Sequence, residues 1–298
     1  MNMKQFKYAL VLAEEKSVSR AAEELGISQP SLSQYIKKIE IEVNARLFDR
    51  SGNEVRLTDA GRAYIDAGRR ILDIERQMVG QISDVNKNVT GSIIVGISPY
   101  RAVSVMPEVI RRFKDKYPGF KIVLEERTGN DLLEGTERGN FDFCITSASV
   151  DTKTLDVIEV MNEEVVLAVP SGMVKPAQKT ADRKYPAVDI SVLSGADVIT
   201  LAKGQLMQRL LDNACEEYGI KYRTSVCCTS IEAQLAMVKA GLGIALVPSG
   251  TDKLKSDGLG YYSIMQNLPK RPIYAAYRKG QYLSKPMLYF IDILKTLE

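Results

Sequence analysis

The stretch SRAAEELGISQPSLSQYIKKIEIEV, residues 19–43, decides the fold of the amino-terminal part of this 298-residue chain. It predicts two short helices joined by a turn at Gly26, because glycine readily takes the positive φ that closes a helix. Ser19 is expected to cap the first helix and Ser28 the second, since a serine hydroxyl accepts a hydrogen bond from a free first-turn amide. Pro30 is compatible with a first helical turn, whose amides have no helical partner. The pattern is typical of a helix-turn-helix.

The second predicted helix has an apolar face and a polar face. Leu32, Ile36 and Ile39 recur at helical spacing and predict the buried side. Amides, hydroxyls and ammonium groups face the other way. Such a surface suits a DNA major groove, because amides and hydroxyls read base edges and ammonium groups contact phosphates. An ordinary amphipathic helix pair is the alternative interpretation of residues 19–43 taken alone.

A hairpin is predicted next, in LFDRSGNEVRLT, residues 47–58, where two apolar runs flank Ser51-Gly52-Asn53. Arg50 and Arg56 lie beside its tip, so the hairpin is expected to contact DNA as a wing; a plain surface hairpin is the alternative. Base edges are expected to face Gln29, Ser31, Ser33 and Gln34, and phosphates to face Lys37, Arg50 and Arg56. The full set of predicted DNA-binding residues is Ser28, Gln29, Pro30, Ser31, Ser33, Gln34, Lys37, Arg50, Asn53 and Arg56.

Charge alone does not predict DNA binding in this part of the chain. Up to Thr58 there are nine lysines and arginines against eight acidic residues, a net charge of +1. However, no acidic residue lies between Leu25 and Ile39, whereas Lys37 and Lys38 do. Because the local field guides a protein to DNA, this placement matters more than the net charge.

The sequence resembles the LysR-type transcriptional regulators, and the resemblance is carried by an ordered set of residues over about sixty positions. The set consists of Ala21-Ala22, Leu25, Ser28-Gln29-Pro30-Ser31-Leu32-Ser33, Ile36, Ile39-Glu40, Leu47-Phe48-Asp49-Arg50 and Leu57-Thr58-Asp59-Ala60-Gly61. The chain departs from the family at Asn44, where glycine is usual, although asparagine also tolerates the left-handed conformation. The resemblance implies a DNA-binding regulator that contacts an interrupted palindrome and RNA polymerase as a homodimer or homotetramer.

A long helix is predicted from residue 59 to the polar, turn-forming residues that end at 90. Ile65, Leu72 and Val79 recur every seven residues, as do Tyr64, Ile71 and Met78, so two apolar stripes run down one side. A helix between two domains has little core of its own, so pairing with the same helix of a second subunit is expected; packing on its own domain is the alternative. The predicted dimerisation residues are Tyr64, Ile65, Ile71, Leu72, Met78, Val79 and Ile82.

The remainder of the chain alternates predicted strands and helices, which favours an α/β fold with parallel sheets. The expected organisation is a winged helix-turn-helix at 1–58, a linker and dimerisation helix with a hinge at 59–90, and an effector-binding domain at 91–298. That domain is expected to have two lobes, 91–162 with 268–298 and 163–267, joined by two crossings. The resemblance implies a fold similar to periplasmic solute-binding proteins.

A ligand site is predicted between the lobes, because ligands of open α/β sheets bind where loops leave the carboxyl ends of strands. The residues at those ends are Ser98, Pro99, Tyr100, Arg101, Thr128, Thr146, Ser147, Thr200, Lys203, Thr229, Ser230 and Pro248. Their hydroxyls, Arg101 and the nearby helix amino termini indicate a small carboxylate or other anion as effector. Any one of them taken singly could instead be a capping or turn residue.

Other function classes have less support. The chain has no histidine, which excludes histidine-based catalysis and histidine metal ligands, and no cofactor or metal is predicted. Its cysteines, Cys144, Cys215, Cys227 and Cys228, fit no zinc spacing and lie in apolar runs, so buried packing is expected. A thiol-based redox-sensing regulator remains an alternative, as do, with less support, a solute-binding protein and an enzyme fused to a DNA-binding head. No signal peptide or membrane span is evident, so a cytoplasmic location is expected.

Overall fold

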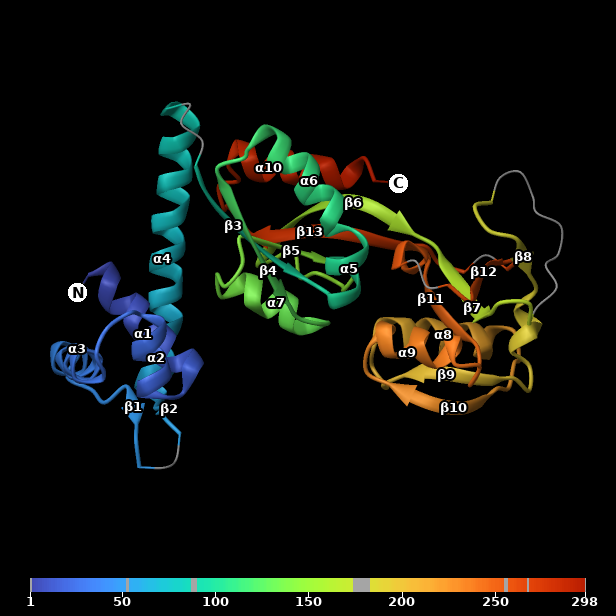
Figure 1. Cartoon of the computed structure of the whole chain (residues 1–298), viewed down its shortest axis with the longest axis horizontal. Coiled ribbons are helices and arrows are strands. Elements are labelled where there is room, and N and C mark those ends of the chain that lie inside the picture. Colours follow the sequence, from blue (N-terminus) through green and yellow to red (C-terminus); the bar gives the residue numbers. More distant parts are fainter. Residues whose placement is uncertain are drawn as a thin grey trace.

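The structure, a computed structural model, describes residues 2–51, 54–86, 90–173, 183–254, 257–266 and 268–297. The predicted wing-tip residue Asn53 therefore lies outside the described residues. Figure 1 shows an amino-terminal helical part, one long helix beside it, and two lobes that follow one another along the long axis.

The amino-terminal part contains α1 (Met3–Glu15), α2 (Val18–Glu24) and α3 (Gln29–Glu42). Leu32, Ile36 and Ile39 are fully buried, as their helical spacing predicts. Gly26 has φ +63° and closes α2. The Ser28 hydroxyl accepts a hydrogen bond from the Ser31 amide and caps α3.

The prediction that Ser19 caps the first helix is wrong. The cap is Ser17, whose extended backbone directly precedes the helix and whose hydroxyl accepts from the Arg20 amide. The helix therefore begins at Val18, and Ser19 lies inside its first turn. There the Ser19 hydroxyl accepts instead from Gln29 Nε2 at 2.8 Å.

The predicted wing is a short hairpin of β1 (Phe48–Asp49) and β2 (Arg56–Leu57), which pair antiparallel. Glu40 Oε1 of α3 accepts from the amides of Leu47 and Phe48, and so fixes the base of the hairpin to α3. The long helix α4 (Asp59–Asn86) follows directly and is capped by Thr58, whose hydroxyl accepts from the Gly61 amide at 2.9 Å.

Lobe I is built on a five-stranded sheet of order β4-β3-β5-β13-β6. Two of its helices, α6 and α10, cover one face and α7 covers the other (Figure 1). Its elements are β3 (Gly91–Ile97), α5 (Pro99–Ser104), α6 (Met106–Lys116), β4 (Phe120–Glu126), α7 (Asn130–Glu137), β5 (Phe143–Thr146), β6 (Leu155–Glu163), β13 (Arg271–Arg278) and α10 (Lys285–Lys295).

Lobe II contains a four-stranded sheet of order β11-β7-β12-β8 and a parallel pair, β9 and β10. Its elements are β7 (Val165–Pro170), β8 (Ala187–Val188), η1 (Ile190–Leu193), β9 (Asp197–Leu201), α8 (Leu206–Glu217), β10 (Arg223–Cys228), α9 (Ile231–Lys239), β11 (Ala245–Pro248), η2 (Ser249–Leu254) and β12 (Leu259–Ile264).

The predicted parallel pairing is confirmed for β3 with β4 and β5 and for β9 with β10, but each lobe also contains antiparallel pairs. β13 runs antiparallel to β5 and β6, and β7 runs antiparallel to β11 and β12. The reason is connectivity: the chain passes directly from β6 in lobe I to β7 in lobe II and returns from β12 to β13. The returning strands therefore run against their neighbours. Among the residues that the structure describes, no helix combines the length and the apolar character needed to cross a membrane.

Candidate DNA-binding surface and ligand cleft

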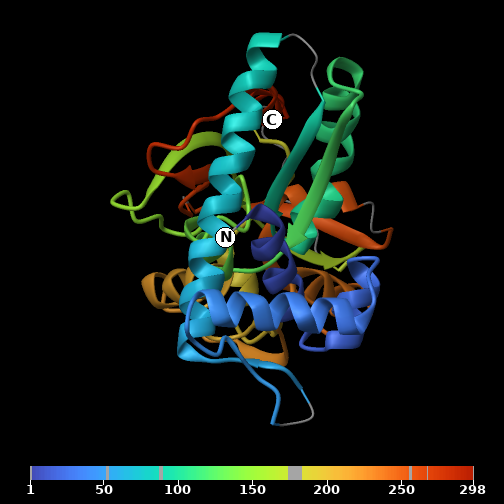
Figure 2. The same cartoon turned by 90° about the vertical axis from the view of Figure 1, so that its left-hand side faces the viewer.

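The polar face of α3 lies open on the surface. Figure 2 shows α3 lying across the amino-terminal part with the wing extending beyond it. The exposed members of the predicted DNA-binding set are Ser28, Gln29, Pro30, Gln34, Lys37, Arg50 and Arg56, whereas Ser31 and Ser33 are half-buried. Because Gln29 donates one amide hydrogen to Ser19, its side chain is held at the start of the helix.

Between the two lobes lies a cleft of about 570 Å³. Most predicted effector-binding residues line it, from five segments that are far apart in sequence. They are Ser98, Pro99, Tyr100, Arg101, Thr128, Thr146, Ser147, Lys203, Thr229 and Ser230. The first seven belong to lobe I and the last three to lobe II. The carboxyl ends of the strands thus meet at one place.

Two of the predicted effector-binding residues do not line this cleft. Thr200 is 4% exposed, and its hydroxyl donates to the Val226 carbonyl across the β9–β10 pair. Pro248 is buried at the end of β11, where it pairs with Val165, and its carbonyl accepts from Thr251. Both predictions were wrong because the side chains belong to the interior of lobe II, although the strands end near the cleft.

A buried group of charges forms part of the lobe I wall, and the sequence prediction missed two of its three members. This arginine cluster consists of Arg101, Glu163 and Arg271, which are 3%, 5% and 6% exposed. Glu163 Oε2 lies 2.8 Å from Arg101 Nη2 and 3.3 Å from Arg271 Nη1. The Tyr100 hydroxyl also donates to the Glu163 carboxylate, at 2.8 Å. Two guanidinium groups share one carboxylate, so the arginine cluster has one positive charge in excess.

The donors of the arginine cluster are not all satisfied. Within the described part of the chain, the Nε atoms of Arg101 and Arg271 are buried and have no hydrogen-bond partner. A buried donor without an acceptor is costly, so a ligand group that accepts from these two atoms would be favoured. Lys203 and Arg209 also line the cleft, opposed by Glu232, so the positive charge extends to the lobe II wall.

The hydroxyl groups of the cleft are oriented by the protein. Ser147 Oγ accepts from Arg271 Nη2 at 2.8 Å, and Thr146 Oγ1 accepts from the Ala148 amide at 3.0 Å. On lobe II, Ser230 Oγ accepts from the Ala233 amide as the cap of α9. A hydroxyl that accepts from the protein still has its own hydrogen to donate. These hydroxyls are therefore suited to a ligand group that accepts hydrogen bonds.

Glu163 stays ionised despite its burial. Burial alone would raise the pKa of its carboxyl, but the positive charges of Arg101 and Arg271 and the hydrogen bonds it accepts hold this pKa below the ordinary value. The charge of the arginine cluster is therefore present at neutral pH.

Three of the four cysteines are buried. Burial raises the pKa of Cys144 and of Cys215 to about 11, and it also raises the pKa of Cys228. The prediction of buried packing is wrong for Cys227, which is exposed on β10 because that strand lies at the edge of lobe II. None of the four lines the cleft.

The long helix α4 divides the predicted dimerisation residues into two groups. Ile65 and Leu72 are only 3% and 8% exposed, so the prediction that they face a second subunit is wrong. The reason is that the first half of α4 packs on α1, where Tyr64 stacks on Phe6. Tyr64 and Ile71 are half-buried.

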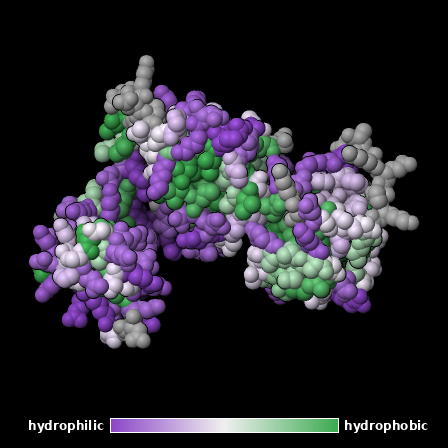
Figure 3. Space-filling view, in the orientation of Figure 1, coloured by the Kyte–Doolittle hydropathy of each residue, from purple (hydrophilic) through white to green (hydrophobic). Residues whose placement is uncertain are grey.

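The second half of α4 leaves its apolar side chains open. Met78, Val79 and Ile82 are each 52% exposed, and Ile74, which the sequence prediction missed, is 65% exposed. We call these four residues the α4 stripe. Apolar atoms gather near this end of α4 in Figure 3.

Two family descriptions match the chain. Residues 3–62 match the bacterial regulatory helix-turn-helix protein of the LysR family, and residues 86–297 match the LysR substrate binding domain. Together they cover the helix-turn-helix, the wing and both lobes.

Relatives match along nearly the whole chain. The uncharacterized HTH-type transcriptional regulator YcgK of Bacillus subtilis is 28% identical over 98% of this chain and 94% of its own length. The hydrogen peroxide-inducible genes activator of Haemophilus influenzae is 29% identical over 94% of this chain and 91% of its own length.

Among solved structures, the fold is similar to that of CbnR, a LysR family transcriptional regulator. The TM-score is 0.72 at 20% identity, over 99% of both chains. A full-length OxyR variant from Pseudomonas aeruginosa also has a TM-score of 0.72, at 21% identity, over 99% of this chain and 98% of the other.

Proposed function

The chain belongs to the LysR family of bacterial transcriptional regulators, and from that premise we propose that a small carboxylate bound between lobes I and II controls its binding to DNA. The observation that carries this proposal is the arginine cluster. Two buried guanidinium groups share one carboxylate in the cleft wall, which leaves one positive charge for an anionic partner.

The direction of the hydroxyl groups supports the same ligand class. Thr146, Ser147 and Ser230 each accept from the protein and have a hydrogen left to donate. A carboxylate accepts hydrogen bonds only, whereas an amide or an alcohol would also present donors. The cleft is therefore expected to prefer an acid to its amide.

On DNA, we propose that α3 enters the major groove with Gln29 and Gln34 toward base edges, and that Lys37, Arg50 and Arg56 contact phosphates. A solved LysR-family structure of this fold, CbnR, is described as complexed with its target DNA. The α4 stripe is proposed to pair with the same helix of a second copy, because four exposed apolar side chains on one helix face need a partner. Two copies would present two recognition helices to two half-sites of double-stranded DNA.

We propose that residues 1–58 bind DNA, that residues 59–90 link the domains and dimerise, and that residues 91–298 bind the effector. Ligand-dependent rearrangement of the copies would change the DNA bend and the contact with RNA polymerase. Such a regulator acts where the DNA is, in the cytoplasm.

Thermal shift with pairs of acids and amides tests the ligand class. Acetate, succinate and benzoate are compared with acetamide, succinamide and benzamide on the full chain. At least one acid should raise the unfolding temperature while its amide does not. In Arg271→Met the acid effect should be largely lost, because the remaining Arg101–Glu163 pair has no excess charge and only the lobe II wall keeps one.

Arg138→Met is the matched control, since Arg138 is an exposed arginine of the same lobe, paired with Glu134 on the surface. It should respond to the acids like the wild type. Stabilisation by neutral or cationic compounds only, or by each amide as strongly as by its acid, would contradict the proposal.

A thiol-based sensor is the second candidate, because several relatives carry the description hydrogen peroxide-inducible genes activator. The residues favour the carboxylate ligand. A reactive cysteine needs a lowered pKa and access, whereas Cys144, Cys215 and Cys228 are buried with raised pKa values, which leaves the exposed Cys227 as the candidate thiol. Turnover of the bound acid would instead favour an enzyme.

A further inference from the structure

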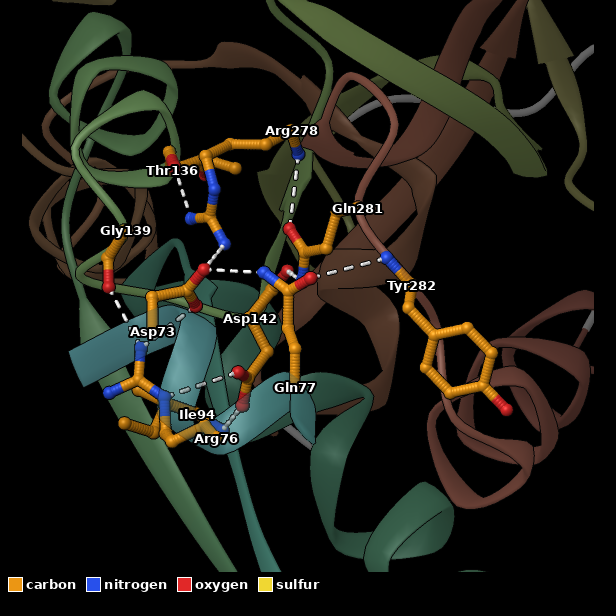
Figure 4. Close-up of polar contacts among 10 residues, drawn as sticks. All are labelled: Asp73, Arg76, Gln77, Ile94, Thr136, Gly139, Asp142, Arg278, Gln281 and Tyr282. Atoms are coloured by element: carbon orange, nitrogen blue, oxygen red, sulfur yellow. Dashed lines mark hydrogen bonds and ion pairs between the residues drawn. The ribbon is translucent and has the colours of Figure 1, made fainter. Parts of the chain in front are cut away.

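A second buried polar group, away from the cleft, holds the long helix against lobe I (Figure 4). Asp73 of α4 is only 2% exposed and forms an ion pair with Arg278, at the end of β13. Arg278 also donates to the Thr136 carbonyl of α7 at 3.0 Å. One guanidinium group therefore joins the helix, the sheet and α7.

A second set of polar contacts between α4 and lobe I lies one turn further along the helix. Arg76 Nη2 donates to the Gly139 carbonyl at 2.9 Å, and Arg76 Nε lies 3.7 Å from Asp142 Oδ1. Asp142 is 1% exposed and accepts from the Ile94 amide of β3 at 2.7 Å. We call Asp73, Arg76, Asp142 and Arg278 the linker cluster. It contains two carboxylates and two guanidinium groups, so its charges balance.

Two elements that carry the linker cluster also reach the ligand cleft. β13 begins at Arg271, in the arginine cluster, and ends at Arg278, in the linker cluster. The first turn of α7 contains Asn130 and Leu132, which line the cleft, and its last turn contains Thr136, whose carbonyl accepts from Arg278. At about 3.4 Å per residue, β13 spans about 24 Å between the two clusters.

β13 is suited to carry a displacement over that distance. It lies inside the five-stranded sheet, paired to β5 through Tyr274, Ala275 and Ala276 on one side and to β6 from Arg271 to Arg278 on the other, with one register shift between Ile273 and Tyr274. A strand bonded on both sides moves with its sheet and bends little. At its far end the bonds to α4 are hydrogen bonds and ion pairs, which depend on direction, so a rotation of the sheet against α4 changes them.

We infer that the linker cluster is the connection through which a ligand in the cleft changes the position of α4, and with it the spacing of the two recognition helices on DNA. This inference rests on the proposed function for the ligand, but the attachment of α4 to lobe I by the linker cluster does not. The expected experiments separate the two.

The test uses the double variant Asp73→Leu/Arg278→Met, which removes both partners of the central ion pair and leaves no unpaired buried charge from that pair. Its matched control is Asp292→Leu/Lys295→Met, an exposed ion pair of 3.0 Å on α10 of the same lobe. Arg278→Lys is the milder variant if the double variant does not fold, because it keeps the charge and loses the second hydrogen bond.

The first measurement is hydrogen–deuterium exchange of the full chain without ligand. In the double variant the amides of residues 66–82 should exchange at least about tenfold faster than in wild type. The loss of one interaction of ordinary strength is enough to produce a change of this size. The amides of α3 and of lobe II should be unchanged, and the control should match the wild type. Unchanged exchange in α4 would refute the attachment.

The second measurement is footprinting on DNA that the wild type selects from a random-sequence pool, with whichever of acetate, succinate or benzoate stabilises it most. In the double variant the acid should still raise the unfolding temperature, but should no longer change the footprint. An acid-dependent footprint equal to that of the wild type would overturn the inference. If no acid stabilises the wild type, the proposed function has failed. The connection between lobe I and α4 is then tested by the footprints without ligand, which should differ between the wild type and the double variant. Identical footprints would refute the connection.

Discussion

Replacing Glu163 by glutamine removes the one carboxylate that lies between two buried guanidinium groups. Glu163 accepts from Tyr100 and from both arginines, and all four residues are less than a tenth exposed. Breaking a buried ion pair by removing one partner costs about 3–5 kcal/mol of unfolding free energy. A domain of this size loses about 2–4 °C in unfolding temperature per kcal/mol, so Glu163→Gln should unfold about 6–20 °C lower.

The assay is thermal unfolding of wild type, Glu163→Gln and Glu159→Gln at several pH values. Glu159 lies on the same strand, is exposed and bonds only at the surface to Asn162, so its replacement should change the unfolding free energy by less than about 0.5 kcal/mol. The pKa of Glu163 is lower in the folded state than in the unfolded chain. Its contribution is therefore complete above the unfolded value of about 4.3 and is lost as the pH falls toward the folded value.

The difference in stability between wild type and Glu163→Gln should accordingly be largest at pH 7 and should shrink below about pH 4. Two results would refute the reasoning. One is a Glu163→Gln protein as stable as Glu159→Gln at pH 7. The other is a stability difference between wild type and Glu163→Gln that does not shrink below about pH 4. That result would mean that the ionised carboxylate does not hold the arginine cluster together.

Three further predictions concern the DNA-binding surface, the α4 stripe and the cysteines. Gln29→Ala should relax sequence preference by about 1–3 kcal/mol at one base pair, whereas Lys37→Ala should weaken all sequences and reduce the salt slope by about one; binding to selected and scrambled DNA at several salt concentrations distinguishes them. Met78→Lys/Ile82→Lys should shift the chain toward monomer in sedimentation, because two charges enter the proposed interface. Leu288→Lys, at an exposed position on α10, is the control and should not shift it. Equal sedimentation of the two variants would argue against the α4 stripe as the interface. Replacing all four cysteines by alanine should leave the acid-induced change in the footprint intact, and an oxidant-dependent footprint of the wild type that disappears in this variant would establish thiol sensing instead.

The elements that the sequence predicted well are those with a strong local period. Leu32, Ile36 and Ile39 repeat at the spacing of one helix face, and β3 is a continuous apolar run, so short-range patterns suffice to identify them. β6 and β12 were missed. Both strands mix polar and apolar residues without a regular period. Which of their side chains are buried depends on strands that lie far away in the sequence.

The same distinction applies to the cleft. Residues at or just after a strand end, such as Thr146 and Ser98, could be predicted because strand ends meet at one edge. Glu163 and Arg271 could not, since only the pairing of β6 with β13 brings together residues that are 108 positions apart. Thr200 and Pro248 were mispredicted because a position at a strand end does not determine to which side its side chain points.

Footprinting of the full chain on its selected DNA, with and without the stabilising acid, shows whether a ligand in the cleft controls DNA binding. We expect protection of two half-sites about one helical turn, or a multiple of it, apart. Saturating acetate, succinate or benzoate should change the extent of that protection in the wild type and in Arg138→Met, but not in Arg271→Met. A footprint that is the same with and without an acid that demonstrably binds the cleft would contradict the claim that the cleft controls DNA binding.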